Sequence, residues 1–537
     1  MTRKSSDHAY PTGVIPSSDS YQRNRRVMLE RLREIEELHG QCLAGGGEKY
    51  VSRHRQRGKL LVRERIDLLL DRDSYFLELS PLAAWGSRFQ VGASIVTGIG
   101  RVSGVECVII ANDPTVRGGT MNPFTSRKWL RALDIAQQNR LPTIQLTESG
   151  GGDLPTQAES FVDGGRVFYD MSRLSKAGIP TMSVVFGNST AGGAYVPGMS
   201  DYAVLIRGRS KVFLGGPPLV KMATGEDATE EELGGGDMHA KISGLADYLA
   251  GDELEALRIA RQVVAHYNWR KLGGPPTLPA DPPVHDPEDL LGIASADLKE
   301  PFDAHEVITR IVDGSRFEEF KLLYGRTLVT GFASIHGYPV GIVANNGVLF
   351  NEESEKAAQF IWLCNQHGTP LLFLQNTTGY VVGTTYEQRG ITKDGSAMVR
   401  AVSNSEVPHL TLMMGASYGA GNYGMSGKAY RPRLVFTWPN HRIGIMGPKQ
   451  MAGVLSIVAR ASADAGGREF DEDQDAAMRS EVEGQLDRES TALFSTGRMW
   501  DDGIIDPRDT RTVLGIALSA IYNGPVKGST DFGPVRL

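Results

Sequence analysis

The sequence predicts two α/β domains in tandem, related by an internal duplication. Predicted strands and helices alternate through both halves of the chain, as they do in domains built from parallel crossovers. A glycine-rich turn of the same kind follows an apolar, β-rich run once in each half, at 189–197 and at 416–425. The length of 537 residues exceeds what one hydrophobic core supports and fits two domains of roughly 200 to 250 residues.

The first half begins with a polar segment, residues 1–20, that we expect to form a mobile arm. Apolar residues at helical spacing then predict a helix from Tyr21 that ends before Gly45. Strands are expected at 107–113, 141–146 and 181–186, and helices at 125–138 and 158–177. The Gly-Gly-Pro-Pro and Asp-Pro-Pro steps within 272–287 mark the boundary between domains at 21–280 and 281–537.

The second half repeats this scheme. Strands are expected at 340–344, 371–374 and 410–414, and a helix at 354–367. The acidic helical stretch 470–495 has no counterpart in the first half. It is a candidate subunit contact, and a solvated helix is the default interpretation.

The two glycine-rich turns are the candidate catalytic elements. Each places small residues, Gly192 and Gly193 in one half and Ala420 and Gly421 in the other, where a strand gives way to a helix. Bare amide groups at a helix start suit an oxygen that gains negative charge. A packing turn is the alternative, and its repetition favours the anion site. The interval from Ser149 to Gly192 is 43 residues, and that from Gly379 to Gly421 is 42.

Composition excludes several classes of function. The net charge of −6 offers no basic excess for nucleic acid, and no apolar run has the length of a membrane span. Three widely spaced cysteines fit a reducing compartment and exclude a four-cysteine zinc ribbon, and we expect no metal site. The run Gly150-Gly151-Gly152-Asp153 lacks the Gly-Lys-Ser/Thr ending of an ATP-binding loop.

Two basic stretches are weaker candidates for phosphate contacts. The cluster formed by His54, Arg55, Arg57, Lys59 and Arg63 is either a contact for a CoA phosphate or, as the simpler alternative, a solvated face. Gly118 and Gly119, with Arg127 and Lys128 as nearby cations, match a phosphate-binding pattern only weakly.

Several long motifs carry a resemblance to a known family. They are 190–197 (TAGGAYVP), 213–225 (FLGGPPLVKMATG), 345–353 (NNGVLFNEE), 419–430 (GAGNYGMSGKAY), 438–447 (WPNHRIGIMG) and 500–511 (WDDGIIDPRDTR). In this order they resemble the carboxyltransferase (β) subunit of biotin-dependent acyl-CoA carboxylases, and the form GAGNYGM resembles the methylcrotonyl-CoA and geranyl-CoA carboxylase branch. The resemblance implies two tandem crotonase-like domains of the ClpP/crotonase superfamily, the first for acyl-CoA and the second for carboxybiotin.

The resemblance also implies roles for individual residues. Gly192 and Gly193 would hold the thioester oxygen of the acyl-CoA, while Ala420 and Gly421 would hold the carbonyl of biotin. The implied substrate contacts are Gly150, Gly151, Gly164, Ala191, Ala194 and Tyr423. The implied contacts to the biotin cofactor are Gly379, Gly419 and Asn422.

Two positions bear on the substrate. The propionyl-CoA branch has an acidic residue where this chain has Tyr423, so Tyr423 favours carboxylation of a β-methyl enoyl-CoA at its γ carbon, unless it is only a packing aromatic. The stretch 161–169 resembles a loop that is longer in methylcrotonyl-CoA carboxylases, with a Phe where this chain has Gly164. A small residue there resembles geranyl-CoA carboxylases and favours a longer acyl chain; the alternative is a repacked loop and a small substrate.

The resemblance further implies that biotin is carried by a separate biotin carboxylase and carrier (α) subunit and is not attached here. It implies a β hexamer within an α6β6 assembly, in the cytoplasm of a bacterium or the mitochondrial matrix of a eukaryote. Three alternatives remain open from the sequence. They are a carboxylase of another acyl-CoA, such as acetyl-, propionyl- or longer-chain CoA, a crotonase-type hydratase or isomerase, and a non-catalytic scaffold subunit.

Overall fold

The computed structural model describes residues 9–298 and 300–531, and they divide into two compact units. The N-terminal unit comprises 36–273 with 520–524, and the C-terminal unit comprises the described residues of 9–35, 274–519 and 525–531. Helices α1 (Asp19–Leu43) and α20 (Thr510–Ile521) each run through a boundary between the units. No helix in the described residues is long and apolar enough to cross a membrane.

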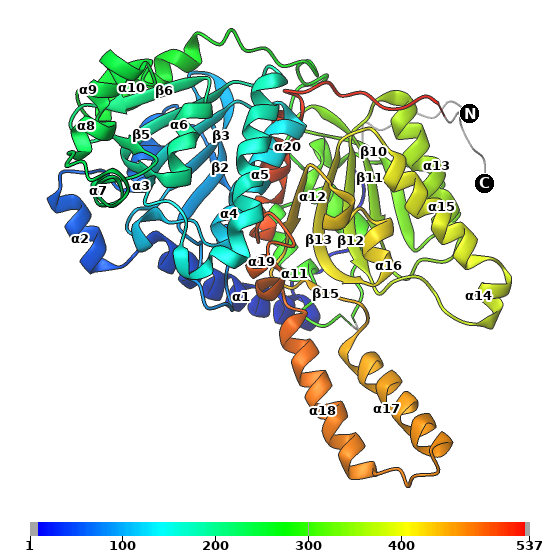
Figure 1. The fold of residues 1–537 in the computed structure, drawn as a ribbon. Coiled ribbons are helices and arrows are strands. Elements are labelled where there is room, and N and C mark those ends of the chain that lie inside the picture. The colour runs from blue at the N-terminus through cyan, green and yellow to red at the C-terminus, as the bar shows by residue number, and fades with distance from the viewer. Residues whose placement is uncertain (1–8, 299, 532–537) are drawn as a thin grey trace. The chain divides into compact units, whose positions relative to one another are not determined.

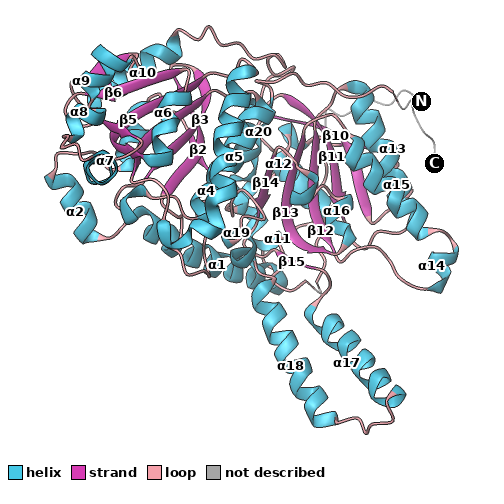
Figure 2. Cartoon of the chain, in the orientation of Figure 1, coloured by secondary structure: helices cyan, strands magenta, loops and turns pink. Residues whose placement is uncertain are grey.

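The N-terminal unit is a twisted sheet with helices on both faces (Figures 1 and 2). Its strands run in the spatial order β1-β2-β3-β4-β5-β6-β8, with β7 paired to β5. The strands are β1 (Phe76–Glu78), β2 (Ile95–Val102), β3 (Val105–Asn112), β4 (Thr143–Ser149), β5 (Thr181–Thr190), β6 (Tyr202–Ile206), β7 (Lys211–Phe213) and β8 (Tyr248–Ala250). The helices are α2 (Glu48–Gln56), α3 (Val62–Leu69), α4 (Pro123–Asn139), α5 (Gln157–Lys176), α6 (Tyr195–Met199), α7 (Pro217–Thr224), α8 (Glu230–Gly234), α9 (Gly236–Met238) and α10 (Glu253–Ala265).

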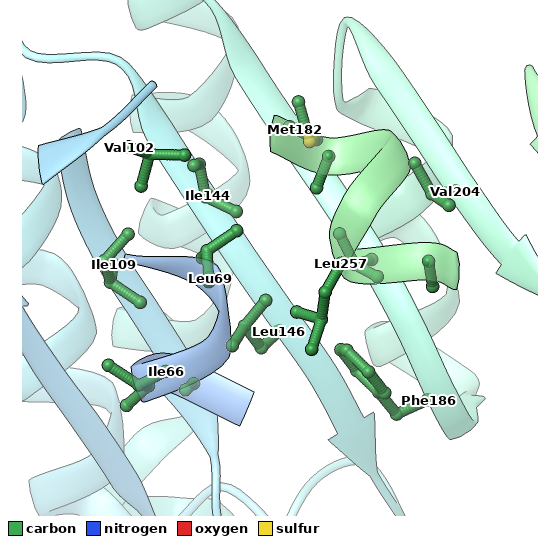
Figure 3. Close-up of a cluster of buried hydrophobic side chains, with 14 of the residues drawn as sticks. Ile66, Leu69, Val102, Ile109, Ile144, Leu146, Met182, Phe186, Val204 and Leu257 are labelled. Atoms are coloured by element: carbon green, nitrogen blue, oxygen red, sulfur yellow. The ribbon is translucent and has the colours of Figure 1, made fainter. Parts of the chain in front are cut away.

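The core of this unit lies between the sheet and the helices α3 and α10 (Figure 3). Ile66 and Leu69 of α3 and Leu257 of α10 pack against strand residues such as Ile109 and Leu146. Because the central strands are covered on both faces, β3, β4 and β5 are buried along almost their whole length, including the polar residues that alternate with apolar ones in β4. This core fixes the ends of β4 and β5, from which the first glycine-rich turn emerges.

The C-terminal unit repeats this order from β1 to β6 as β9-β10-β11-β12-β13-β14, with β15 paired to β13 as β7 is to β5; in the described residues its sheet has no strand equivalent to β8. Its strands are β9 (Glu318–Glu319), β10 (Leu328–Ile335), β11 (Tyr338–Asn345), β12 (Leu371–Thr377), β13 (His409–Tyr418), β14 (Leu434–Thr437) and β15 (Arg442–Gly444). Its helices are α11 (Leu290–Ile293), α12 (Ala304–Ile311), α13 (Asn351–His367), α14 (Thr384–Gln388), α15 (Ile391–Asn404), α16 (Ala420–Gly424), α17 (Pro448–Ala465), α18 (Glu472–Glu489) and α19 (Ala492–Gly497).

The duplication extends to local geometry. The antiparallel hairpins β2-β3 and β10-β11 both turn through a residue pair with positive φ, Ser103-Gly104 in one unit and His336-Gly337 in the other. Such pairs match the right-handed twist of the flanking strands. Each unit therefore builds the same scaffold from different side chains, as the repeated motifs predict.

The N-terminal residues depart from the prediction. From Tyr10 onward the segment expected to be a mobile arm is hydrogen-bonded within the C-terminal unit, for example from the Tyr10 amide to the Ser315 carbonyl at 2.9 Å. Residues 1–8 of the predicted arm lie outside the described residues. His305 contributes to this attachment, because its ring stacks on that of Tyr10 with centroids 5.1 Å apart and bridges the carboxylates of Asp303 and Glu319. The sequence pattern of the arm contains no signal for this partner.

Candidate functional site

The first glycine-rich turn begins where β5 ends at Thr190. A short 3-10 helix, Ala191–Ala194, follows and continues into α6. Ala191 has a left-handed backbone, with φ of 54°, that swings the chain away from the strand. Gly192 and Gly193 then lie in the first helical turn, where amide groups lack a partner inside the helix. Their carbonyls are engaged, because the amide of Tyr195 donates to both and the Ser189 hydroxyl donates to Gly193 at 2.8 Å.

The second turn has the same construction. Tyr418 ends β13, Gly419 takes the left-handed position with φ of 56°, and Ala420 and Gly421 open α16. Strand register fixes the correspondence, because Thr190 pairs with Phe213 of β7 as Tyr418 pairs with Gly444 of β15. Gly192 therefore corresponds to Ala420, and Gly193 to Gly421. The predicted catalytic residues thus occupy equivalent positions in the two units, and their contact with ligands remains a prediction.

The glycines upstream of each turn support it from the neighbouring strand. The Gly151 amide donates to the Ser149 hydroxyl and the Gly379 amide to the Thr377 hydroxyl, each at 3.1 Å. Both glycines have positive φ, 93° and 114°, and lie close to the end of the strand before the turn: a Cβ on Gly151 would come within 3.0 Å of the Thr190 carbonyl. The structure therefore corrects the repeat, since Gly151 rather than Ser149 corresponds to Gly379. With that pairing the intervals to Gly193 and Gly421 are equal.

Several predicted contacts use their polar groups inside the fold. The Gly150 amide donates to the Gly118 carbonyl at 3.1 Å, and the side chain of Asn422 donates to the Ser417 hydroxyl at 2.8 Å. Ala194 is buried. Gly150 and Asn422 therefore stabilise the shape of their turns through these hydrogen bonds, and their predicted contact with a ligand remains a prediction.

A half-exposed tyrosine follows each turn. Tyr195 and Tyr423 occupy equivalent positions and are 48% and 47% exposed. Tyr195 meets the edge of Phe168 with ring centroids 5.8 Å apart, and Tyr423 stacks on Tyr430 at the same separation. Tyr423 is therefore not a core packing residue. Sequence reasoning singled out Tyr423 and missed Tyr195, although the motif repeat aligns them.

Gly164 lies within α5, which confirms the helix predicted at 158–177, and not in the loop described from the family resemblance. The stretch 161–169 is helical although it contains two glycines. Val167, Met171 and Leu174 are buried on one face of α5, and their packing stabilises the helix. Gly164 is partly exposed, and a Cβ placed on it would touch the terminal methyl of Met121 at 3.6 Å. The comparison of loop lengths made from the sequence therefore concerns a helix.

A buried charge cluster lies at the foot of the first turn. The Glu148 carboxylate is bound by Lys59 and, at 2.8 Å, by the fully buried Arg65, which also pairs with Glu253 at 3.0 Å. Burial by itself would raise the pKa of Glu148, but the charges of Arg65 and Lys59 outweigh it and the pKa lies below its usual value. Gly187 of β5 allows this approach, because a Cβ there would lie 2.6 Å from the carboxylate. The equivalent position in the C-terminal unit is Asn376, which is uncharged.

Most of the predicted basic cluster is engaged in ion pairs. Lys59 binds Glu148, Arg55 binds Glu64 at 2.7 Å, and Arg63 forms a two-pronged pair with Glu78. These contacts favour neither a solvated face nor a phosphate site for Lys59 and Arg63, whose charges are already compensated.

A pair of equivalent buried lysines was not recognised from the sequence. Lys128 donates to the carbonyls of Gly92 and Ile95, and Lys356 donates to the corresponding carbonyls of Gly325 and Leu328. Burial lowers the pKa of each to about 8. Lys128 therefore holds α4 to the start of β2 and is not available to a phosphate, whereas the predicted contacts of Gly118, Gly119 and Arg127 remain a prediction. The repeat spacing is the signal that would have identified both.

Comparisons with known proteins agree with this geometry. The family model described as carboxyl transferase domain matches residues 53–532. A Mycobacterium tuberculosis protein named as a probable biotin-dependent acyl-coenzyme A carboxylase beta2 subunit is 62% identical over 97% of this chain and 99% of its own length. The biotin-dependent 3-methylcrotonyl-coenzyme A carboxylase beta1 subunit of the same organism is 50% identical over 95% of this chain and 97% of its own.

A solved structure is similar over almost the whole chain. The beta subunit of Pseudomonas aeruginosa geranyl-CoA carboxylase superposes with a TM-score of 0.89 at 42% identity, covering 98% of this chain and 100% of that one. The methylcrotonoyl-CoA carboxylase beta chain of Dictyostelium discoideum, named as mitochondrial, is 48% identical over 97% of this chain and 90% of its own length.

Proposed function

This chain belongs to the carboxyl transferase domain family and is a biotin-dependent acyl-CoA carboxyltransferase, and from that premise we propose that it carboxylates a β-methyl enoyl-CoA at the γ carbon. Relatives named for 3-methylcrotonyl-CoA and geranyl-CoA support this substrate class. The observation that carries the carboxyl-transfer reaction itself is the doubled turn, one in each unit, with equivalent residues at each helix start. Hydratase and scaffold functions are set aside by the family.

We propose that the two turns serve two different oxygens. Removing a proton from the acyl chain places negative charge on the thioester oxygen, and in this proposal the amides of Gly192 and Gly193, at the helix start, donate to it. The amides of Ala420 and Gly421 form the second donor pair, for the carbonyl oxygen of biotin. Carboxybiotin supplies the activated carboxyl group. Fixed donors of this kind need no reorganisation when charge develops, so they lower the barrier directly.

We propose that biotin arrives on a separate subunit. The family's beta chains are named as subunits, and the proposal is a biotin carboxylase and carrier (α) partner with a β hexamer at the centre of an α6β6 assembly. The corresponding compartment is the cytoplasm of a bacterium, or the mitochondrial matrix of a eukaryote. The isolated chain should then be oligomeric and inactive until the biotinylated partner is added.

We further propose that the acyl chain is longer than that of 3-methylcrotonyl-CoA. Gly164 leaves space on α5 that a phenyl ring would fill, and each added buried methylene discriminates by roughly 10- to 200-fold in favourable pockets. The test reconstitutes the holoenzyme and measures kcat/KM for acetyl-, propionyl-, 3-methylcrotonyl- and geranyl-CoA. The proposal expects geranyl-CoA to be preferred over 3-methylcrotonyl-CoA, and Gly164→Phe to reverse the order.

The matched control is Gly165→Phe. Gly165 is the next helical residue, and a Cβ there meets nothing within 4 Å, so this variant changes the same helix without filling the same space. A native preference for the shorter thioester, or equal ratios in Gly164→Phe and the native enzyme, would refute the long-chain assignment. Preference for acetyl- or propionyl-CoA would refute the β-methyl enoyl-CoA class.

A further inference from the structure

An apolar face of α5 extends from the first turn to Gly164. Phe168 lies four residues after Gly164, on the same side of the helix. The tip of its ring is 3.8 Å from where a Cβ on Gly192 would be, and its edge meets Tyr195. Because Phe168 is only half-buried, this face continues from the donor amides along α5 as accessible apolar surface.

Met121 stands at the other end of this face. Its backbone is fixed by two hydrogen bonds to the upstream glycine turn, from its amide to the Gly151 carbonyl and from the Asp153 amide to its carbonyl, each at 2.9 Å. Its side chain points to α5, and the terminal methyl lies 3.6 Å from the Cβ position of Gly164. The backbone of Met121 is therefore rigid while the end of its side chain faces the space that Gly164 leaves.

The polar groups beside Met121 are already satisfied. The Asp153 carboxylate receives hydrogen bonds from Arg117 and from the Thr156 hydroxyl, each at 2.8 Å. A compensated carboxylate does not oppose an apolar chain in the way an unpaired one would. Outside α5, the group that lies within 4 Å of a Cβ on Gly164 is the terminal methyl of the Met121 thioether, at 3.6 Å.

We propose that Met121 is a specificity-determining residue that sets the depth of the acyl-chain subsite. The inference rests on the proposed function, because it takes the chain bound beside Gly192 to be an acyl-CoA. Methionine is unbranched and polarizable, with three rotatable bonds, so its end moves aside for a long chain and fills the space behind a short one. Gly164 opens the subsite from α5, and Met121 determines how far it extends.

The test compares Met121→Ala and Met121→Phe in the reconstituted holoenzyme. Removing the thioether deepens the subsite, so Met121→Ala should raise kcat/KM for geranyl-CoA relative to 3-methylcrotonyl-CoA by about 10-fold. The stiff phenyl ring of Met121→Phe should lower the same ratio by about 10-fold or more. The effect should appear in KM and in the dissociation constants of the two thioesters with the assembled β chain.

Met238→Ala is the matched control, because Met238 in α9 belongs to the same unit and is also partly exposed. It should leave the ratio unchanged. Ratios within about twofold of the native value in both folded Met121 variants would overturn the inference while leaving the proposed function intact. If the native enzyme carboxylates neither thioester, the proposed function fails and this inference fails with it. Met121→Leu keeps the volume of the side chain, so this variant should fold and should stay near the native ratio.

Discussion

Substitution of Gly421 by alanine tests whether the position of the second turn controls catalysis, because the added Cβ displaces the turn. A Cβ on Gly421 would lie 2.9 Å from the Gly379 Cα and 3.0 Å from the Thr377 methyl. Ordinary contact begins near 3.4 Å, so the start of α16 must move by about 0.5 Å against backbone that is itself hydrogen-bonded. The movement shifts the donor amides of Ala420 and Gly421 from the position they hold in the native turn.

The expected loss follows from that displacement. Complete removal of one oxyanion donor lowers kcat by roughly 100- to 1,000-fold, about 2.7 to 4 kcal/mol, and a misplacement of about 1 Å costs about 100-fold. A displacement of about half that distance acts on both donor amides at once, so Gly421→Ala should lower kcat for acyl-CoA carboxylation on the order of 100-fold, with the assembly intact. Overpacking should also lower the free energy of unfolding by about 1 to 3 kcal/mol, visible as a lower Tm.

Two matched variants make this test specific. A Cβ on Gly193 has only the Ser189 hydroxyl near it, at 3.8 Å, so Gly193→Ala leaves its turn in place and should cost less than about 10-fold. Gly453→Ala in α17 meets open space and should leave kcat unchanged. The reasoning is refuted if assembled Gly421→Ala turns over like Gly453→Ala.

The remaining predictions concern buried charges. Burial raises the pKa of Asp501 to about 6, so its contribution to stability is present at low pH and is lost as the pH rises through 6. The Tm of the native protein should therefore fall between pH 4 and 7, and Asp501→Asn should remove this part of the fall. An unchanged pH dependence of Tm in Asp501→Asn would contradict the raised pKa. Although burial opposes it, hydrogen bonds to Asp303 and Glu319 raise the pKa of His305 to about 9, so its stabilisation is complete below pH 6.5 and lost through pH 9. The Tm of the native protein should fall from pH 7 to 10, and the Tm of His305→Gln should fall less over the same range. Equal pH dependences of Tm in the two proteins would contradict this role of His305. Glu148→Gln removes the buried carboxylate that Lys59 and Arg65 share and leaves only Glu253 to compensate Arg65. It should destabilise the unit by about 3 kcal/mol or more in urea unfolding, whereas a loss below about 1 kcal/mol would show the cluster to be dispensable.

The sequence predicts the fold well where periodicity and turn chemistry are strong. The helix predicted at 125–138 is α4, Pro123–Asn139, because Asn122 caps its start and Pro123 suits the first turn. The sequence reveals the duplication because the turns require small residues at fixed positions, where the backbone is left-handed or approaches a neighbouring strand closely. Pairing Ser149 with Gly379 was off by two residues, since only structure shows which residue takes the left-handed backbone.

Other features depend on contacts that are distant in sequence. Nothing near Tyr10 indicates that His305 will stack on it. The family resemblance treats the stretch with Gly164 and Gly165 as a loop, yet burial of one face of α5 keeps both glycines helical, as predicted for 158–177, at a cost of about 1 kcal/mol each. The two turn glycines look interchangeable along the chain, and only the neighbours of each Cβ separate Gly193 from Gly421.

The most direct test of the two-turn account is the fixation of radiolabelled bicarbonate into acyl-CoA by the reconstituted holoenzyme. The account predicts acid-stable label in a β-methyl enoyl-CoA only when ATP, the biotinylated partner and this chain are all present. It also predicts that Gly421→Ala lowers the rate on the order of 100-fold while Gly453→Ala does not. Full label incorporation without the biotinylated partner, or at the native rate with an assembled Gly421→Ala chain, would contradict it.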